Sequence, residues 1–153
     1  MASLQEELKQ ARAFKSLEEE ANLNIARTAA LLEHALAQAL KPFDITPTQY
    51  NVLRILKGAG PDGLCRNEVG ERLVRRVPDV TRLLDRMQEM ELIGRHRGGA
   101  DRRYVTTTIA KKGTDLLNRL DKQICAIHRT QLGHLDRKQL EDLIGLLTLA
   151  RQG

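Results

Sequence analysis

The sequence predicts a mainly helical protein in which a helix-turn-helix is followed by a β-hairpin. Apolar residues recur at about 3.6-residue spacing along most of the chain, which is the pattern of amphipathic helices. In the middle, a short helical pattern at residues 65–73 precedes a longer one at 77–91. Two alternating segments, 92–97 and 104–109, follow this pair and indicate the two strands of the hairpin, the wing.

The composition sets broad limits. A length of 153 residues fits one domain with helical extensions. Apolar residues make up 41% of the chain and aromatic residues only 3%, and tryptophan is absent, so leucine, isoleucine, valine and alanine must build the core. The net charge of +5 is compatible with a polyanionic partner but does not identify one.

The N-terminal third is predicted to be helical. Residues 3–20 read as a weakly amphipathic helix or a frayed arm, and residues 21–41 as a stronger helix that Pro42 ends. The next helix opens at Thr46, where Thr-Pro-Thr-Gln supplies an N-cap, a proline at the first helical position and the Gln49 of a capping box.

Two further helices are predicted at the C-terminal end. An apolar stripe runs along residues 110–132. Asp136 and Gln139 then form an N-cap and capping-box pattern that opens the last helix. Its inward face is expected to hold Leu140, Leu143, Ile144 and Leu147. Leu146 and Leu149 make this face wider than one partner helix would cover.

Arginine is concentrated in the middle of the chain. Residues 66–103 contain ten arginines, no lysine and seven acidic residues, a balance of ten minus seven, or +3. The planar guanidinium group offers paired donors that suit phosphates and base edges. A helix-turn-helix can place its second helix in the major groove of DNA. The expected contacts around this helix are Arg76, Pro78, Asp79, Thr81, Arg82 and Arg86.

The first turns of helix 77–91 leave two interpretations open. In one, Thr81 and Arg82 contact bases or phosphates, and Asp79 accepts a hydrogen bond from a cytosine amino group. In the other, Asp79 caps the helix and the arginines form a solvated face.

The turn between the strands is rich in glycine and arginine. Arg102 and Arg103 would protrude there and reach a minor groove, whose potential favours arginine. Asp101 would hold Arg103 through a salt bridge. Arg97, near the end of the first strand, is a further expected DNA contact. The alternative is a surface hairpin with an incidental ion pair.

These motifs together resemble the MarR family of transcriptional regulators over residues 25–150. The matching segments are Ile45-Thr-Pro-Thr-Gln-Tyr-Asn-Val-Leu-Arg54, Glu68-Val-Gly-Glu-Arg-Leu73, Val80-Thr-Arg-Leu-Leu-Asp-Arg-Met87, Leu92-Ile93, Arg95, Asp101, Arg103 and Gly113. The set is specific, whereas any one piece alone is weak. Glu91 stands where the family usually has glycine, and Ala110 replaces a usual threonine, so Thr108 is the candidate cap for helix 110–132.

The resemblance implies a homodimeric winged helix-turn-helix protein. Residues 1–42 and 110–153 would form a helical dimerisation region, and residues 43–109 would form the DNA-binding region. Helix 77–91 would be the recognition helix, with Thr81 and Arg82 among its contacts. The two wings would flank a pseudo-palindromic operator in double-stranded DNA, with Arg103 at the wing tip and Asp101 as its support.

Many members of the family respond to small phenolic or carboxylic ligands that bind between the dimer helices and the winged domain. The residues that could line such a cleft are His34, Tyr50, Arg54 and His128. Core or surface packing is the alternative for each of them.

The two cysteines, Cys65 and Cys125, have no CxxC or histidine companion, so no metal site, cofactor or disulfide is expected. Cys65 lies beside Arg66 at a predicted helix start, where a thiolate would be stabilised. A thiol-responsive regulator that uses Cys65 or Cys125 is therefore an alternative to two inert residues.

The N-terminus has no apolar signal region, and no stretch reaches the roughly 18 apolar residues of a membrane span. We therefore expect a cytoplasmic protein without a membrane partner. No nucleophile and base stand together, so an enzyme is not expected. The sequence favours a homodimeric repressor that a small ligand releases from DNA. A winged-helix module that binds a partner protein is the alternative class.

Overall fold

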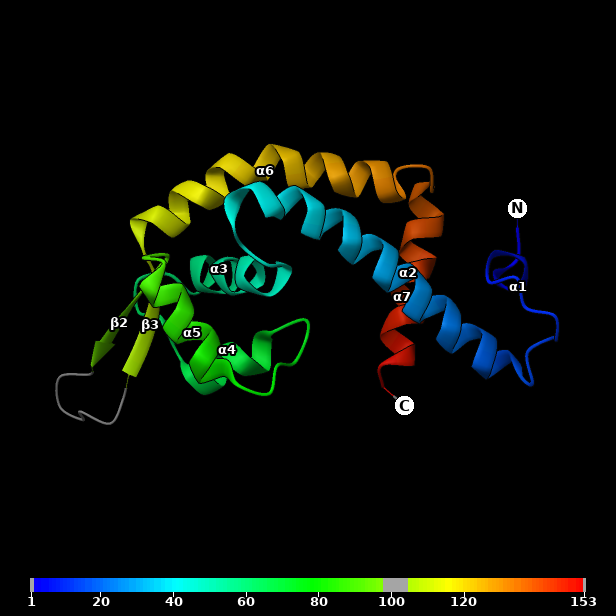
Figure 1. The fold of residues 1–153 in the computed structure, drawn as a ribbon, viewed down its shortest axis with the longest axis horizontal. Coiled ribbons are helices and arrows are strands. Elements are labelled where there is room, and N and C mark those ends of the chain that lie inside the picture. The colour runs from blue at the N-terminus through cyan, green and yellow to red at the C-terminus, as the bar shows by residue number, and fades with distance from the viewer. Residues whose placement is uncertain (1, 98–104, 153) are drawn as a thin grey trace.

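The helix-turn-helix and the hairpin form one end of the molecule, and two long helices lead away from them (Figure 1). The structure is a computed structural model and describes residues 2–97 and 105–152. In chain order its elements are α1 (Leu4–Glu7), α2 (Leu17–Leu40), the 3-10 helix η1 (Lys41–Phe43), α3 (Pro47–Ala59), β1 (Leu64–Cys65), α4 (Arg66–Arg72), α5 (Val80–Glu89), β2 (Ile93–Arg97), β3 (Val105–Ile109), α6 (Lys111–Leu132) and α7 (Arg137–Ala150). The predicted fold class, mainly α with a winged helix-turn-helix, is confirmed.

The strands form an antiparallel sheet in the order β1-β3-β2. The hairpin pairs Ile93 with Ile109 and Arg97 with Val105, as the alternating segments predicted. The short strand β1 was not predicted, because two residues are too few to show a pattern. Gly63 allows this strand to approach β3, since it has a φ of +68° and a Cβ there would lie 2.5 Å from the Thr107 carbonyl oxygen.

The helix starts follow local capping. Thr46 and Gln49 form the predicted capping box, in which Gln49 N donates to Thr46 Oγ1 at 3.2 Å and Thr46 N donates to Gln49 Oε1 at 2.9 Å. The predicted start of the first long helix at residue 21 was wrong. Ser16 caps α2 by accepting from Glu19 N at 3.2 Å, so the helix begins at Leu17.

The recognition-helix candidate α5 is shorter than the predicted 77–91. Asp79 is its N-cap, so Pro78 precedes the helix rather than lying in its first turn. The expectation that Thr108 caps α6 was wrong. The N-cap position is Ala110, which provides no side-chain hydrogen bond, and Thr108 Oγ1 lies 3.1 Å from His96 Nε2 instead.

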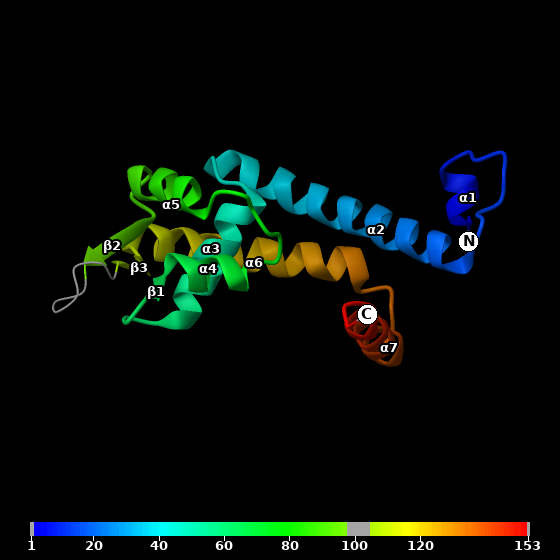
Figure 2. The ribbon, with the colours of Figure 1, turned by 90° about the horizontal axis from the view of Figure 1, so that it is seen from below.

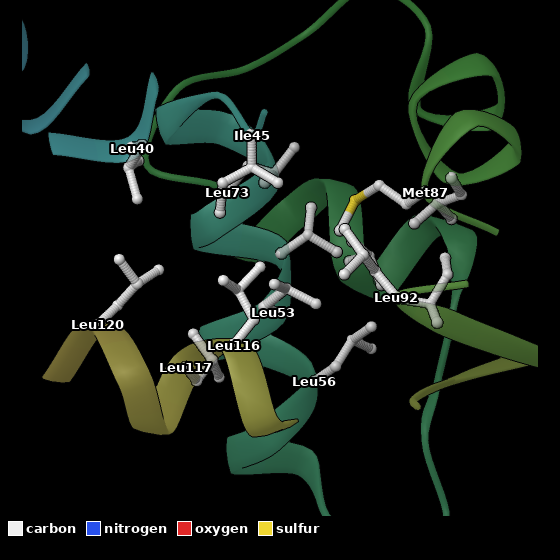
Figure 3. Packing of buried hydrophobic residues seen from close by; sticks show 14 of the residues in the cluster. Leu40, Ile45, Leu53, Leu56, Leu73, Met87, Leu92, Leu116, Leu117 and Leu120 are labelled. Carbon is white, nitrogen blue, oxygen red and sulfur yellow. The ribbon is translucent and has the colours of Figure 1, made fainter. Parts of the chain in front are cut away.

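One apolar core joins these elements. Leu53 and Leu56 of α3 meet Met87 of α5, while Leu117 and Leu120 approach from α6 (Figure 3). The same cluster includes residues from the end of α2, from α4 and its C-cap, and from the sheet, among them Leu40, Val69, Leu73 and Ile93. The core therefore lies under the helix-turn-helix and continues along the first half of α6.

Apolar side chains remain uncovered at the other end of the molecule. In a single chain no residue of α7 is buried, although Ile144 and its neighbours were predicted to face inward. Ile144, Leu146 and Leu149 are 64%, 66% and 66% exposed. Figure 2 shows α7 standing apart from α2, which itself exposes Leu17, Leu23, Ile25 and Leu31. Within residues 2–97 and 105–152, no helix is both long and apolar enough to span a membrane.

Glu91 ends the turn after α5 in the left-handed conformation, with a φ of +60°. An L residue there costs about 1–2 kcal/mol, whereas glycine adopts this conformation without that strain. We expect Glu91→Gly to raise the free energy of unfolding by about 0.5–1 kcal/mol, measured by urea denaturation.

The matched control is Glu89→Gly, at the last residue of α5. This change should lower the free energy of unfolding by about 1 kcal/mol, because the position is helical. A Glu91→Gly variant as destabilised as the control would contradict the strain at Glu91.

Candidate nucleic-acid interface

The two helices of the helix-turn-helix pack closely where α4 crosses the start of α5. A Cβ at Gly70 would lie 3.2 Å from Val80 Cγ2, so this glycine permits the approach. Leu84 and Met87 lie on the inner face of α5 and are buried in the core. Thr81, Arg82 and Arg86 on the opposite face are exposed.

The described residues of the predicted DNA-binding set are all exposed, namely Arg76, Pro78, Asp79, Thr81, Arg82, Arg86 and Arg97. They border two depressions that meet at the start of α5, and they include the last residue of β2. Four of them line an open depression of about 620 Å³ between α4 and the start of α5, namely Arg76, Pro78, Asp79 and Thr81. Arg82 and Arg86 border a second depression with Asp44, Asp85 and Glu89, and Arg97 ends β2.

The Asp79 side chain binds the backbone at the start of α5. Its Oδ1 atom accepts a hydrogen bond from Arg82 N at 2.9 Å. The capping interpretation of Asp79 is therefore confirmed. This cap fixes the residue at which α5 begins, and with it the direction in which Thr81 and Arg82 emerge.

Thr81 is held from α4 by Arg66, which was not among the predicted DNA contacts. Arg66 Nη1 donates to Thr81 Oγ1 at 3.1 Å, and Arg66 also contacts Asn67 Oδ1 at 3.3 Å. Since the Thr81 oxygen accepts from Arg66, its own proton is available for an acceptor on a partner, such as a phosphate oxygen or a base edge.

A second arginine links the sheet to α5. Arg95 Nη1 lies 2.6 Å from Asp85 Oδ1, and Arg95 Nη2 donates to the Thr81 carbonyl oxygen at 3.4 Å. Ten residues separate Arg95 from Asp85, so no local motif in the sequence indicates this pair. The alternation of side chains along β2 is the only sequence signal for the side of the strand on which Arg95 lies.

The turn between α4 and α5 is fastened to two other helices. Val74 N donates to Asn51 Oδ1 of α3 at 2.9 Å. Arg75 forms an ion pair with Glu33 of α2. The long helix α2 thus contacts the segment that leads into α5. The predicted wing-tip residues Arg102 and Arg103, and their support Asp101, lie outside the described residues.

The four predicted ligand-lining residues are spread over three helices. Tyr50 is half-buried on α3, and this burial raises the pKa of its phenol, an effect that the nearby charge of Arg54 opposes. Arg54 is exposed one turn further along α3. His34 on α2 and His128 on α6 are both exposed.

The cysteines differ in their surroundings. Cys65 is half-buried at the N-cap of α4, where its N–H donates to Glu68 Oε2 at 2.8 Å and so lowers the pKa of that carboxyl. Cys125 is exposed on α6. Neither cysteine is in a disulfide.

The cap at Asp79 can be tested by stability. Asp79→Ala should lower the free energy of unfolding by about 1 kcal/mol because it removes the acceptor for Arg82 N. Asp79→Asn keeps an acceptor and should stay within a few tenths of a kcal/mol of the parent protein in urea denaturation. An alanine variant as stable as the asparagine variant would show that the cap contributes nothing.

Comparison with known proteins identifies the family. The model of the MarR family matches residues 43–103. A MarR transcription factor from Planctomyces limnophilus is 34% identical, with a TM-score of 0.68 over 90% of this chain and 99% of that one.

Two further structures share the fold. The transcriptional repressor CouR, bound to a 23-mer DNA duplex, is 24% identical, with a TM-score of 0.78 over 93% of this chain and 99% of that one. BpsR of Bordetella bronchiseptica, whose DNA binding is regulated by 6-hydroxynicotinic acid, is 18% identical, with a TM-score of 0.79 over 92% and 99%. With its helix-turn-helix, its hairpin and these matches, the chain belongs to the MarR family of transcriptional regulators.

Proposed function

We propose that this protein is a homodimeric repressor that binds a pseudo-palindromic operator and is released from it by a small ligand. The observation that carries the proposal is the outer face of α5. There Thr81, Arg82 and Arg86 are exposed on a helix whose other face is fixed in the core. The structure of CouR, a repressor of the same fold, shows that protein bound to a DNA duplex.

The contacts divide into two kinds. The start of α5 would lie in the major groove, where Thr81 and Arg82 reach base edges, and Arg86 one turn later would bind phosphate. Arg97, at the end of β2, would contact the sugar-phosphate backbone of the DNA. Arg103 is the proposed minor-groove contact at the wing tip, on the strength of its place in the sequence.

The dimer would form through residues 1–42 and 110–153, with residues 43–109 carrying the DNA-binding surface. The apolar side chains that α2 and α7 leave exposed support this division, because a second copy that covered them would remove apolar surface from water. A second copy supplies the same side chains, and two-fold pairing is the commonest arrangement of soluble homo-oligomers. Two copies would place two recognition helices on one operator.

Ligand release is the third part of the proposal. Tyr50 and Arg54 place a phenol and a guanidinium on α3, where the charges of Arg54 and of Asp121 on α6 both act on the Tyr50 phenol. A carboxylate on an aromatic ring could pair with Arg54 there. BpsR, whose DNA binding responds to an aromatic acid, shares this fold.

DNA selected from a random-sequence pool by the purified protein tests the contacts. Arg86→Ala should weaken binding to all sequences and reduce the slope of log affinity against log salt by about one, because one phosphate contact is lost. Arg82→Ala should cost about 1–3 kcal/mol on the selected site and relax the sequence preference.

The matched control for both variants is Lys122→Ala, which removes one positive charge from an exposed position of α6. Its affinity and salt slope should match those of the parent protein in fluorescence anisotropy. Equal losses in all three variants would mean that only net charge matters, and the α5 contacts would be wrong.

The dimer is tested at α7. Ile144→Glu combined with Leu146→Glu should give folded monomers, because these side chains are 64% and 66% exposed in one chain and become buried only against a partner. Lys138→Glu, at an exposed polar position of the same helix, should leave the dimer intact. Sedimentation measures the mass and circular dichroism the helix content. A double variant that stays dimeric would contradict this interface.

A further inference from the structure

An ion pair joins the two elements that are proposed to contact DNA. Arg95, in the middle of β2, reaches across to α5, where one guanidinium nitrogen lies 2.6 Å from Asp85 Oδ1 and the other lies 3.4 Å from the Thr81 carbonyl oxygen. The Arg95 side chain is 22% exposed and that of Asp85 is 52% exposed. Figures 1 and 2 both show α5 beside the hairpin.

This arrangement leaves Arg95 poorly suited to bind phosphate directly. Its charge is balanced by Asp85, and both of its terminal nitrogens already have acceptors. Most of the side chain is covered, within a groove that Thr81, Leu84 and Thr107 also line. By contrast, Arg82 and Arg86 have no ion-pair partner among residues 2–97 and 105–152.

The two contacts of Arg95 lie one helical turn apart on α5. Residues 81 and 85 stand above one another on a helix, so fixing both sets the rotation of α5 about its axis and its distance from β2. Thr81 is fixed from the other side by Arg66 of α4. Arg97 lies two residues beyond Arg95 and therefore on the same face of the strand.

We propose that Arg95 and Asp85 act as positioning residues, which hold the recognition helix and the wing in the single arrangement that binds DNA. This inference rests on the proposed function, in which α5 and the hairpin contact one DNA site. It gives an acidic residue on the DNA-facing helix a favourable role. Asp85 strengthens binding through Arg95, although its own charge repels phosphate.

The sign of the effect of Asp85→Asn separates this role from simple electrostatics. Removing a negative charge beside a polyanion should tighten binding if charge alone matters. We expect Asp85→Asn to weaken binding to the selected DNA about fivefold, since the neutral amide holds Arg95 less firmly. The slope of log affinity against log salt should not change, because no phosphate contact is lost.

Three further variants complete the test. Glu89→Gln removes an acidic charge from an exposed position one turn further along α5 and should bind as tightly as the parent protein or tighter. Arg95→Gln should weaken binding as Asp85→Asn does, and the double variant should be no weaker than either single variant. The exchange Asp85→Arg with Arg95→Asp should recover part of the affinity. Melting temperatures show that each variant is folded.

Two results would overturn the inference alone. One is an Asp85→Asn variant that binds as tightly as Glu89→Gln. The other is an Arg95→Gln variant whose salt slope falls by about one while Asp85→Asn is unaffected, which would make Arg95 a direct phosphate contact. A parent protein that retains no DNA from the random pool would instead overturn the proposed function, and this inference with it.

Discussion

At Gly113 the backbone of α6 passes so close to its neighbours that no side chain fits. A Cβ there would lie 2.4 Å from the Leu92 carbonyl oxygen and 3.0 Å from Leu53 Cδ2. The same Leu92 oxygen accepts a hydrogen bond from Ala110 N at 3.0 Å. This approach brings Leu117 and Leu120 into the core beside α3, so the long helix, the sheet and the helix-turn-helix share one packed core.

The other long helix, α2, contacts the turn that leads into α5. Arg75, in the turn before α5, pairs with Glu33 of α2, and Gln131 of α6 donates to the Leu32 carbonyl oxygen of α2 at 3.0 Å. A shift of α2 against α6 would therefore act on the turn that leads into α5. Such contacts provide a physical route by which the proposed ligand, bound between the dimer helices and the winged domain, would alter the proposed DNA-binding surface.

Local chemistry in the sequence was enough to predict most of the fold. The capping boxes at Thr46 and Asp136 need only residues three apart, and both formed as predicted. The predicted start of α5 at residue 77 was wrong. The apolar pattern continues through Val77, but the cap at Asp79 decides where the helix begins. Strand β1 was missed because it exists only through its pairing with β3.

The candidate site was less accessible to sequence reasoning. Exposed positions on α5 follow from helical periodicity, so Thr81, Arg82 and Arg86 could be named in advance. The roles of Arg66 and Arg95 depend on which elements meet in space, across 15 and 10 residues of sequence. Nothing in an arginine's identity tells whether it is free to bind phosphate or is already committed to a carboxylate or a hydroxyl group within the protein.

In the proposed complex, two copies of α5 and two hairpins contact one DNA site. Hydroxyl-radical and methylation footprinting of the complex with DNA selected from a random pool tests it most directly. We expect an inverted repeat with two protected major-groove segments about 10 base pairs apart, or a multiple of this, each flanked by a protected minor groove. A single protected segment, or a selected sequence without an inverted repeat, would contradict it.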